Sequence, residues 1–443
     1  MTIYALSSAP GVSGIAVIRI SGLETKDIIK KITGNPLPSP RQATLRKINK
    51  INTNDLIDEG IVIWFPGPNS YTGEDMAELQ VHGSRAVIEA ILDTFSNLEN
   101  CRLADPGEFT KIALSNNKIN LLEAESIGDL ISSETEIQRL QALKVMSGDN
   151  LEIYLNWRNK LIKVLSNVEA KIDFPEEDLP KNILKEIKTE TEKIKNEIKK
   201  SLNDQKVGER IREGFKIAIV GPPNAGKSSL LNYLSRRDVA IVSEIAGTTR
   251  DVIETHLNLN GYPVVMSDTA GIRDSKDEIE KKGIKLALKK AENADLNIIV
   301  IEPKSGYFTG FLKELISSRS ILVVNKSDLG TKNIQEEFKK FKPIYISLKN
   351  ESNLNLLIEE IKQRLKKQFL NSDDILITRN RHRVNLEECE KYLINFNQKD
   401  LSKEFDKAAE DLRLAARCLG KIVGKVDVEE ILDSIFNDFC IGK

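Results

Sequence analysis

Gly221-Pro-Pro-Asn-Ala-Gly-Lys-Ser228 is the stretch that decides the fold of this 443-residue chain. It has the spacing G-x-x-x-x-G-K-S, follows the apolar run 217–220 and opens a helical run. Glycines at these positions let backbone N–H groups turn inward onto phosphate, Lys227 can reach the β and γ phosphates, and the Ser228 hydroxyl can ligate Mg²⁺. The stretch predicts a phosphate-binding loop between a strand and a helix. The alternative is an incidental glycine-rich turn.

Short apolar runs bounded by loops surround this stretch, at 217–220, 264–266, 296–301 and 321–324. Strands of this kind alternating with helices predict a parallel sheet that is covered on both faces. We therefore expect a Ras-like α/β P-loop domain over residues 211–371.

Three further motifs follow in the order that a guanine-nucleotide site requires. Asp268-Thr-Ala-Gly271 ends a strand, so its carboxylate can hold the outer shell of a metal ion and the Gly271 N–H can reach a γ phosphate. In Asn325-Lys-Ser-Asp328, the last carboxylate can accept hydrogen bonds from guanine N1–H and its 2-amino group, which adenine cannot supply. Gly247-Thr-Thr249 can supply a switch threonine to Mg²⁺, and Ser347-Leu-Lys349 stands where Ser-Ala-Lys is usual in a base loop. The predicted nucleotide-binding residues are Asn224, Ala225, Gly226, Lys227, Ser228, Ser229, Ser243, Glu244, Ile245, Ala246, Gly247, Thr248, Thr249, Asp268, Thr269, Ala270, Gly271, Asn325, Lys326, Asp328, Ser347, Leu348 and Lys349.

Ile272 stands directly after Gly271, where many signalling GTPases place a glutamine that orients water. Isoleucine cannot orient water, so another group must do so, and the charge that an arginine finger would neutralise needs another cation. Asn224 and the segment 243–249 offer oxygens for a monovalent ion.

The regions on either side of this domain differ in pattern. Residues 1–118 mix strands, expected at 15–20 and 61–65, with helices. Residues 119–210 have helical periodicity, with a break at Asp173-Phe174-Pro175, and residues 372–443 are helical again. We expect an N-terminal α+β domain and a helical domain into which the α/β domain is inserted, which gives an α/β plus α fold class.

Composition narrows the function classes. Lys plus Arg is 65 and Asp plus Glu is 66, so any nucleic-acid contact must use a local patch rather than a basic chain. There is no apolar run long enough for a membrane span and no secretory signal, and scattered cysteines at 101, 389, 418 and 440 suit a reducing compartment. The sequence predicts a cytoplasmic protein without membrane contact. Only three histidines are present, and we expect His82 to pack rather than to act in catalysis.

Five segments together resemble the MnmE (TrmE) family of tRNA modification GTPases: GPPNAGKSS (221–229), IAGTTRD (245–251), DTAGIR (268–273), WFPGPNSYTGED (64–75) and FCIGK (439–443). The last two are the most specific, because few other GTPases carry them. The resemblance covers the whole chain, although His82-Gly-Ser84 replaces the more usual HGG.

The resemblance implies roles for individual residues. Asn224, Ser243, Ile245 and Thr248 would ligate K⁺, and Ser228 and Thr249 would ligate Mg²⁺. Glu280 would position the attacking water and Lys227 would be a second catalytic residue, although on sequence alone Glu280 reads as a solvated carboxylate. A tetrahydrofolate one-carbon carrier of the 5-formyl or 5,10-methylene type would be bound by Arg19, Glu78, Lys118 and Lys443, with Cys440 near it as a catalytic thiol; composition alone would make that thiol a packed side chain.

The resemblance also implies an activity and its partners. A homodimer would join an FAD-dependent MnmG (GidA) partner in a heterotetramer. Hydrolysing GTP, this complex would add a carboxymethylaminomethyl-type group to C5 of the wobble uridine of certain tRNAs. The alternative is a ribosome-assembly or translation-factor switch that uses the same nucleotide motifs without modification chemistry.

Overall fold

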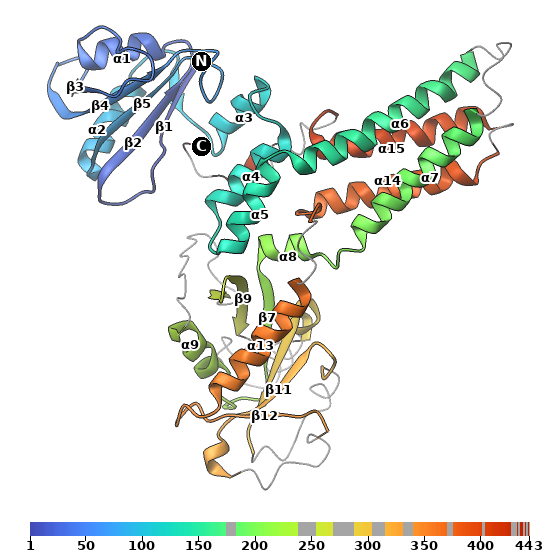
Figure 1. The fold of residues 1–443 in the computed structure, drawn as a ribbon. Coiled ribbons are helices and arrows are strands. Elements are labelled where there is room, and N and C mark those ends of the chain that lie inside the picture. Colours follow the sequence, from blue (N-terminus) through green and yellow to red (C-terminus); the bar gives the residue numbers. More distant parts are fainter. Residues whose placement is uncertain are drawn as a thin grey trace, which may run out of the picture. The chain divides into compact units, whose positions relative to one another are not determined.

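The computed structural model describes residues 1–173, 183–237, 254–268, 288–303, 315–330, 340–369, 375–400 and 404–426, together with 432, 435, 436, 439 and 442. Figure 1 labels the helices and strands of the chain, which divides into two compact units. The first comprises Met1–Ile131, Val145–Lys181 and Lys399–Lys443, and the second comprises Ser132–Lys144 and Asn182–Gln398. Both units are therefore assembled from separate stretches of sequence.

The first unit begins with a six-stranded sheet in the order β3-β4-β5-β2-β1-β6, antiparallel except for the parallel pair β1 and β6. Its strands are β1 (Thr2–Leu6), β2 (Ser13–Ser21), β3 (Thr44–Asn49), β4 (Leu56–Phe65), β5 (Met76–Gly83) and β6 (Cys101–Leu103). The strands expected at 15–20 and 61–65 lie inside β2 and β4, which confirms them.

Two helices cover one face of this sheet, α1 (Thr25–Thr33) and α2 (Arg85–Ser96). Ile29 of α1 and Phe95 of α2 are fully buried in one cluster with Ile18 and Leu79 of the strands. Burying side chains of this size stabilises each helix on the sheet by roughly 1.5–3 kcal/mol per residue. A smaller cluster around Ile3 and Phe109 involves α3 (Glu108–Ser115).

The other elements with given bounds in the first unit are the helices α4 (Leu121–Ile131), α6 (Asp149–Asp173) and α15 (Phe405–Val423). Helices α6 and α15 pack along each other, with Tyr154, Leu161 and Leu412 fully buried. Helix α6 ends at Asp173, where the sequence predicted a break. The chain forms three helices before that break rather than one long run.

The second unit contains a six-stranded sheet in the order β12-β11-β10-β7-β9-β8. Its strands are β7 (Phe215–Val220), β8 (Glu254–Leu259), β9 (Tyr262–Asp268), β10 (Leu296–Ile301), β11 (Ser320–Val324) and β12 (Ile344–Tyr345). All neighbouring pairs are parallel except β8 with β9. The prediction of a parallel sheet with its strands in these places is confirmed.

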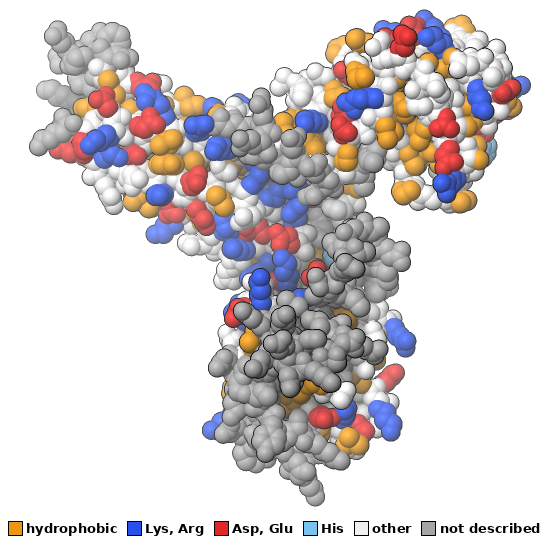
Figure 2. All heavy atoms as spheres, turned by 180° about the vertical axis from the view of Figure 1, so that it is seen from behind, with side chains coloured by type: hydrophobic (Ala, Val, Ile, Leu, Met, Phe, Trp, Pro, Cys, Tyr) orange, Lys and Arg blue, Asp and Glu red, His pale blue; other side chains and the backbone are white. Residues whose placement is uncertain are grey.

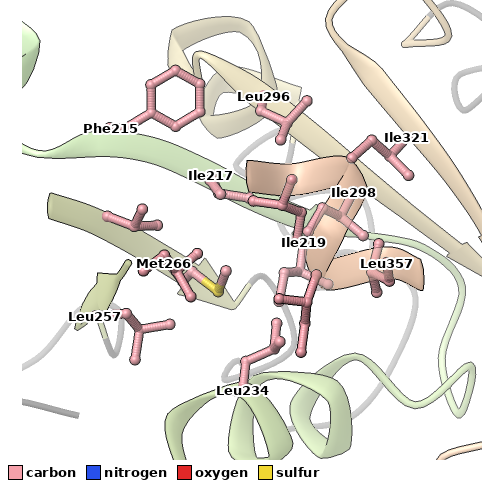
Figure 3. Packing of buried hydrophobic residues seen from close by; sticks show 14 of the residues in the cluster. Phe215, Ile217, Ile219, Leu234, Leu257, Met266, Leu296, Ile298, Ile321 and Leu357 are labelled. Atoms are coloured by element: carbon pink, nitrogen blue, oxygen red, sulfur yellow. The ribbon is translucent and has the colours of Figure 1, made fainter. Parts of the chain in front are cut away.

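Alternate residues of the central strands of this sheet are buried on opposite faces. Ile217 and Ile219 of β7 lie in one cluster with Ile298 (Figure 3), whereas Ala218 and Val220 lie in the other. Both faces of the sheet are therefore shielded from water, which explains why the sequences of these strands are unbroken apolar runs.

The helices with given bounds in the second unit are α5 (Glu136–Met146, its last two residues assigned to the first unit), α7 (Ile183–Leu202), α8 (Val207–Glu213), α9 (Lys227–Arg237), α13 (Leu354–Phe369) and α14 (Asn380–Gln398), and residues 288–293 are also helical. The helices predicted for 119–210 are thus shared between the two units. The predicted domain boundaries at 118, 210 and 371 stay a prediction.

A buried ion cluster fixes α8, which leads into β7, to α14, which follows the sheet domain. The Arg383 guanidinium donates to both carboxylate oxygens of Glu209, to Asp204 and to the carbonyl of Leu202 at 2.6–3.0 Å. Arg383 and Glu209 are 5% and 7% exposed. Burial lowers the pKa of Arg383, but the hydrogen bonds to Glu209 and Asp204 outweigh it and hold the pKa above its usual range. The cluster therefore fastens together the two points at which the chain enters and leaves the sheet domain.

Charges of both signs are mixed over the described surface that Figure 2 shows, which agrees with the near-zero net charge. Within the described ranges, no helix combines the length and the hydropathy that crossing a membrane requires.

Candidate functional site

The loop between β7 and α9 is shaped by two glycines. A Cβ on Gly221 would overlap the carbonyl of Val300 on β10, and a Cβ on Gly226, whose φ is +97°, would overlap the side-chain amide of Asn325. Both positions combine positive φ with close packing, so side chains are excluded there. The loop backbone is held against the ends of β10 and β11, as a phosphate cradle requires.

Helix α9 begins at Lys227, directly behind this loop. Lys227 is 8% exposed and its Nζ donates to the carbonyl of Pro222 at 2.9 Å, whereas Ser228 and Ser229 are exposed at the first turn. The N-terminus of a helix attracts anions because its backbone N–H groups are unpaired and its dipole is positive there. At this end of the helix, the buried ammonium of Lys227 can donate hydrogen bonds to phosphate oxygens, and the Ser228 hydroxyl can ligate Mg²⁺.

Asn325 joins the phosphate loop to the predicted base loop. Its Nδ2 donates to the carbonyl of Ala225 at 2.8 Å, and its Oδ1 accepts from the N–H of Leu348 at 3.2 Å. Asn325 is 3% exposed, so both bonds are shielded from water. One amide therefore fixes the spacing between the two loops that would hold the ends of a nucleotide.

Asp328 is oriented by the second base loop. The hydroxyl of the fully buried Ser347 donates to Asp328 Oδ1 at 2.6 Å. This hydrogen bond lowers the pKa of Asp328, and the charges of Lys349 and Lys326 act in the same direction. Lys326 also pairs with Glu302 at 2.6 Å. An ionised, oriented carboxylate is the acceptor that the two donors on the edge of guanine require.

Several predicted residues lie outside the described parts of the chain. They are Ser243, Glu244, Ile245, Ala246, Gly247, Thr248, Thr249, Thr269, Ala270, Gly271, Glu280, Cys440, Lys443 and the side chain of Asp268. The backbone of Asp268 is described and pairs with Ile219 of β7, next to the phosphate loop. The structure thus brings together Asn224, Ala225, Gly226, Lys227, Ser228, Ser229, Asn325, Lys326, Asp328, Ser347, Leu348 and Lys349.

The first unit holds a second candidate site, around Arg19 on β2 and Glu78 on β5. The two residues are cross-strand partners, and the guanidinium donates twice to Glu78 Oε1, at 2.8 and 3.1 Å. Arg19 also lies 5.6 Å from the ring centre of Tyr71 and 5.7 Å from that of Phe109. The carbonyl of Gly442 accepts from Arg19 Nη1 at 3.4 Å. Two of the predicted folate contacts and a residue of the FCIGK segment therefore meet here.

Lys118 belongs to the loop that follows α3. Its Nζ donates to the carbonyl of Pro68 at 2.9 Å, and the neighbouring Asn116 donates to the carbonyl of Thr72 at 2.7 Å. Both contacts are to the segment 64–75. The exposed ammonium of Lys118 thus lies beside that segment, where it could meet an acidic ligand.

His82 was expected to pack rather than to act in catalysis, and the expectation that it packs is wrong. Its side chain is 71% exposed, and its Nδ1 lies 2.9 Å from Asp58 Oδ1 on the neighbouring strand. His82 stands at the end of β5, where the alternation of the strand turns it away from the core. Among the described residues, no group of three or more His, Cys, Asp or Glu side chains could hold a metal ion.

Sequence reasoning missed Ser7, Tyr71 and Phe109 at the Arg19 site and Glu302 beside Lys326. Tyr71 lies inside the quoted segment 64–75, so that motif contained a usable signal. Ser7 donates to the carbonyl of Gly442 at 2.8 Å across 435 residues, and no local pattern marks it.

Comparison with known proteins gives consistent results over the whole length. The family described as "GTP-binding protein TrmE N-terminus" matches residues 2–118, and the "MnmE helical domain" family matches residues 121–440. Two relatives named "tRNA modification GTPase MnmE" are 67% identical (Pelagibacter ubique) and 43% identical (Rickettsia bellii), and each alignment covers 100% of both chains. A third relative of that name, from Parvibaculum lavamentivorans, is 44% identical with the same coverage. The chain therefore belongs to the MnmE family of tRNA modification GTPases.

Proposed function

We propose that this chain, a GTP hydrolase that acts in tRNA modification, requires K⁺ as well as Mg²⁺ and uses a tetrahydrofolate one-carbon unit. Together with an FAD-dependent MnmG (GidA) partner, it would add a carboxymethylaminomethyl-type group to C5 of the wobble uridine. The observation that carries this proposal is that residues 2–118 and 121–440 match the N-terminal and the helical domain families of the MnmE (TrmE) proteins. A ribosome-assembly or translation switch needs the nucleotide motifs but neither the Arg19 site nor the FCIGK segment.

The phosphate loop supports the nucleotide half of the proposal. Lys227 and the first turn of α9 would bind the β and γ phosphates, Ser228 and Thr249 would ligate Mg²⁺, and Asp268 would order its outer shell. Asp328 would read guanine while Ser347 and Asn325 hold the base loops in place. These assignments use the chain's own donors and acceptors, and each can be tested by a single substitution.

The K⁺ requirement is supported by Asn224 and by Ile272. Asn224 is exposed within the phosphate loop at φ +62°, so its amide oxygen is available to a cation. The residue that follows Gly271 is an isoleucine, which cannot orient water. A cation bound by Asn224, Ser243, Ile245 and Thr248 would stabilise the charge that develops in the transition state.

GTP turnover is expected to be faster in K⁺ than in Na⁺ at matched ionic strength. Equal rates in the two salts would contradict the K⁺ site.

Glu280→Ala should keep GTP affinity and lower turnover by about 10²- to 10⁴-fold, the range for a group that assists proton transfer. Normal turnover in this variant would mean that Glu280 is a solvated carboxylate without a role in hydrolysis.

The one-carbon half rests on Arg19, Glu78, Lys118 and Lys443. A pterin ring offers an amide-like edge to a carboxylate, and its glutamyl chain offers carboxylates to cations. Cys440 would be a reactive thiol near the folate.

We further propose domain boundaries at 118, 210 and 371. The protein would be a cytoplasmic homodimer joined through the N-terminal domain, and it would form a heterotetramer with the MnmG partner.

The experiment that tests the function is nucleoside analysis of tRNA from cells that lack this protein. Loss of the C5 group at the wobble uridine, restored by the wild-type chain, is the expected result. Unchanged tRNA nucleosides together with a ribosome-assembly defect would favour the switch instead.

A further inference from the structure

The end of β10 carries a carboxylate that the nucleotide motifs do not include. In the parallel register of β10 and β11, Ile301 lies opposite Val324, and the carbonyl of Ile301 accepts from the N–H of Asn325 at 2.8 Å. The next residue, Glu302, is therefore level with the start of the base-reading motif. Ligands of such sheets bind at the carboxyl ends of the strands, so Glu302 lies at the edge where the nucleotide is expected.

Strand β10 also borders the phosphate loop. Its other neighbour is β7, on which Val220 lies opposite Ile299. A Cβ on Gly221, the first residue of the loop, would stand 2.1 Å from the carbonyl of Val300. Glu302 thus ends a strand that lies between the phosphate loop and the base loop. A negative charge here opposes the binding of a polyphosphate unless another group neutralises it.

Lys326 neutralises this charge. Its Nζ donates to Glu302 Oε2 at 2.6 Å, and the Lys326 and Glu302 side chains are 35% and 28% exposed. The backbone of Lys326 has φ +59°, in the left-handed region, and its carbonyl accepts from the N–H of Leu329 at 3.0 Å, which closes the turn that carries Asp328. Both the backbone and the side chain of Lys326 are therefore held by other parts of the second unit.

This pairing changes what Lys326 offers to a nucleotide. A lysine side chain without a partner loses much of its rotamer freedom when a ligand orders it. In Lys326 that loss occurs before the nucleotide arrives, because Glu302 already holds the ammonium. The four-carbon stem is then an ordered apolar surface two positions before Asp328.

We propose that Glu302 is a positioning residue of the nucleotide site, which acts through Lys326 on the guanine end of the nucleotide and not through its charge on the phosphates. This inference rests on the nucleotide site proposed above, in which Asp328 reads guanine. It predicts both the sign of the effect on affinity and its dependence on the number of phosphates.

Binding titrations of the full-length chain with GDP and with GppNHp, a GTP analogue that resists hydrolysis, separate the two roles. If Glu302 orders the base loop, Glu302→Ala should weaken the binding of both nucleotides by the same factor. That factor should be about three- to tenfold, between the ranges for an exposed ion pair and for a hydrogen bond to a charged group. Glu302→Gln keeps a neutral acceptor for Lys326 and should lose less, about two- to threefold.

A carboxylate that acted on the phosphates by its charge would give the opposite sign. Both variants would then bind more tightly than the wild type, by similar factors, and the gain would be larger for GppNHp because it carries more phosphate charge than GDP. That result would overturn the positioning role, and so would unchanged affinities.

Lys326→Met tests whether Glu302 acts through the ammonium, because methionine keeps an unbranched apolar stem and lacks the charge. In the Lys326→Met background, Glu302→Ala should not lower the affinity any further. A loss by the same factor in both backgrounds would show that Glu302 acts independently of Lys326, either directly or through the fold, and the proposal would be wrong.

The kinetics of GTP hydrolysis give a readout that a general loss of structure would not produce. Glu302→Ala should raise KM for GTP by about the factor found in the titrations and leave kcat within about twofold of wild type, as expected for an interaction that is equal in the ground state and the transition state. A lower kcat with an unchanged KM would place Glu302 in the hydrolysis step and contradict the positioning role.

Glu359→Ala is the matched control. Glu359 also pairs with a lysine in the second unit, Lys362 on α13, at 3.4 Å, but its side chain is 62% exposed and lies outside the nucleotide motifs. This variant should change neither the nucleotide affinities nor KM. Equal losses in Glu359→Ala and Glu302→Ala would mean that removing any ion pair of the unit weakens binding, and the specific role of Glu302 would be refuted.

This inference and the proposed nucleotide site can fail separately. The preference for GTP over XTP in Asp328→Asn decides whether this site reads guanine. If that preference does not change, the base is read elsewhere and the proposed site is wrong. If it changes while Glu302→Ala binds like the wild type, only the positioning role of Glu302 is wrong.

Discussion

Gly226 in the phosphate loop and Gly442 near the end of the chain have the same φ, +97°, and each lies where a Cβ would overlap a neighbour. In the first case the neighbour is the Asn325 amide, 99 positions away; in the second it is the backbone of Leu6, 436 positions away. The two glycines meet the same physical demand, a backbone that must come close to another part of the protein.

What differs is the information that surrounds each glycine. Gly226 lies in a contiguous motif, so its neighbours in the sequence predict a phosphate-binding loop between a strand and a helix. Gly442 has only FCIGK beside it, and its partners Ser7 and Arg19 come from two early stretches of the chain. A site built from one loop can be derived residue by residue, whereas a site built from distant strands requires the fold.

The largest expected effect concerns the contiguous site. Asp328→Asn places a donor where guanine also presents donors, and the preference for GTP over XTP should change by about 10⁴-fold. Titration with GTP, XTP and ATP measures this preference. An unaltered preference would show that Asp328 does not read the base.

Arg383→Ala tests whether the two regions belong to units that unfold separately. Removing the arginine leaves Glu209 and Asp204 buried without their partner, which should cost the second unit about 3–5 kcal/mol. Both tryptophans, Trp64 and Trp157, lie in the first unit, so their fluorescence reports that unit, whereas circular dichroism reports both. The dichroism transition in urea should move to lower concentration more than the fluorescence transition does.

Lys391→Ala, an exposed change on the same helix as Arg383, is the control and should move neither transition. Coincident shifts of both signals in Arg383→Ala would mean that the chain unfolds as one cooperative system.

Gly226→Ala and Gly442→Ala form the direct contrast. Gly226→Ala should weaken GTP binding by about 10- to 100-fold, because strain at positive φ and the displaced Asn325 amide act together. Gly442→Ala should leave GTP binding unchanged, because Gly442 contacts Leu6 and Ser7 rather than the nucleotide loops. A loss of GTP affinity in Gly442→Ala would show that the two sites are energetically coupled.

Ser347→Ala should have the smallest effect, about a two- to tenfold loss of GTP affinity at neutral pH from the lost orientation of Asp328. The Ser347 hydroxyl lowers the pKa of Asp328, so the pKa should rise towards its ordinary value in the variant. Binding needs the ionised carboxylate and is lost as pH falls through that pKa, so the acid limb of the binding profile should move to higher pH. An acid limb at the wild-type position would show that the hydroxyl does not set the ionisation of Asp328.

Much of the fold could be predicted because periodicity is a local property. The apolar runs at 217–220 and 296–301 lie in the strands β7 and β10, and the break expected at Asp173 is the end of α6. The allocation of α5 to the second unit could not be predicted, because Gln138 and Gln141 bind carbonyls of Arg212 and Gly208 that lie 74 and 67 residues away. The exposure of His82 could not be predicted either, because it depends on which face of β5 is covered by the rest of the domain.

The hydrogen bond from Ser7 to Gly442 closes a loop of 435 residues. For a flexible chain the entropic cost of closure rises with the logarithm of length, by about 0.6 kcal/mol for each doubling. The segment Phe215–Phe369, which contains the whole second sheet, lies inside that loop and forms roughly a third of it. Removing it would shorten the loop by less than one halving, so an entire nucleotide-binding domain can be inserted or lost while the closure cost changes by less than about 0.6 kcal/mol.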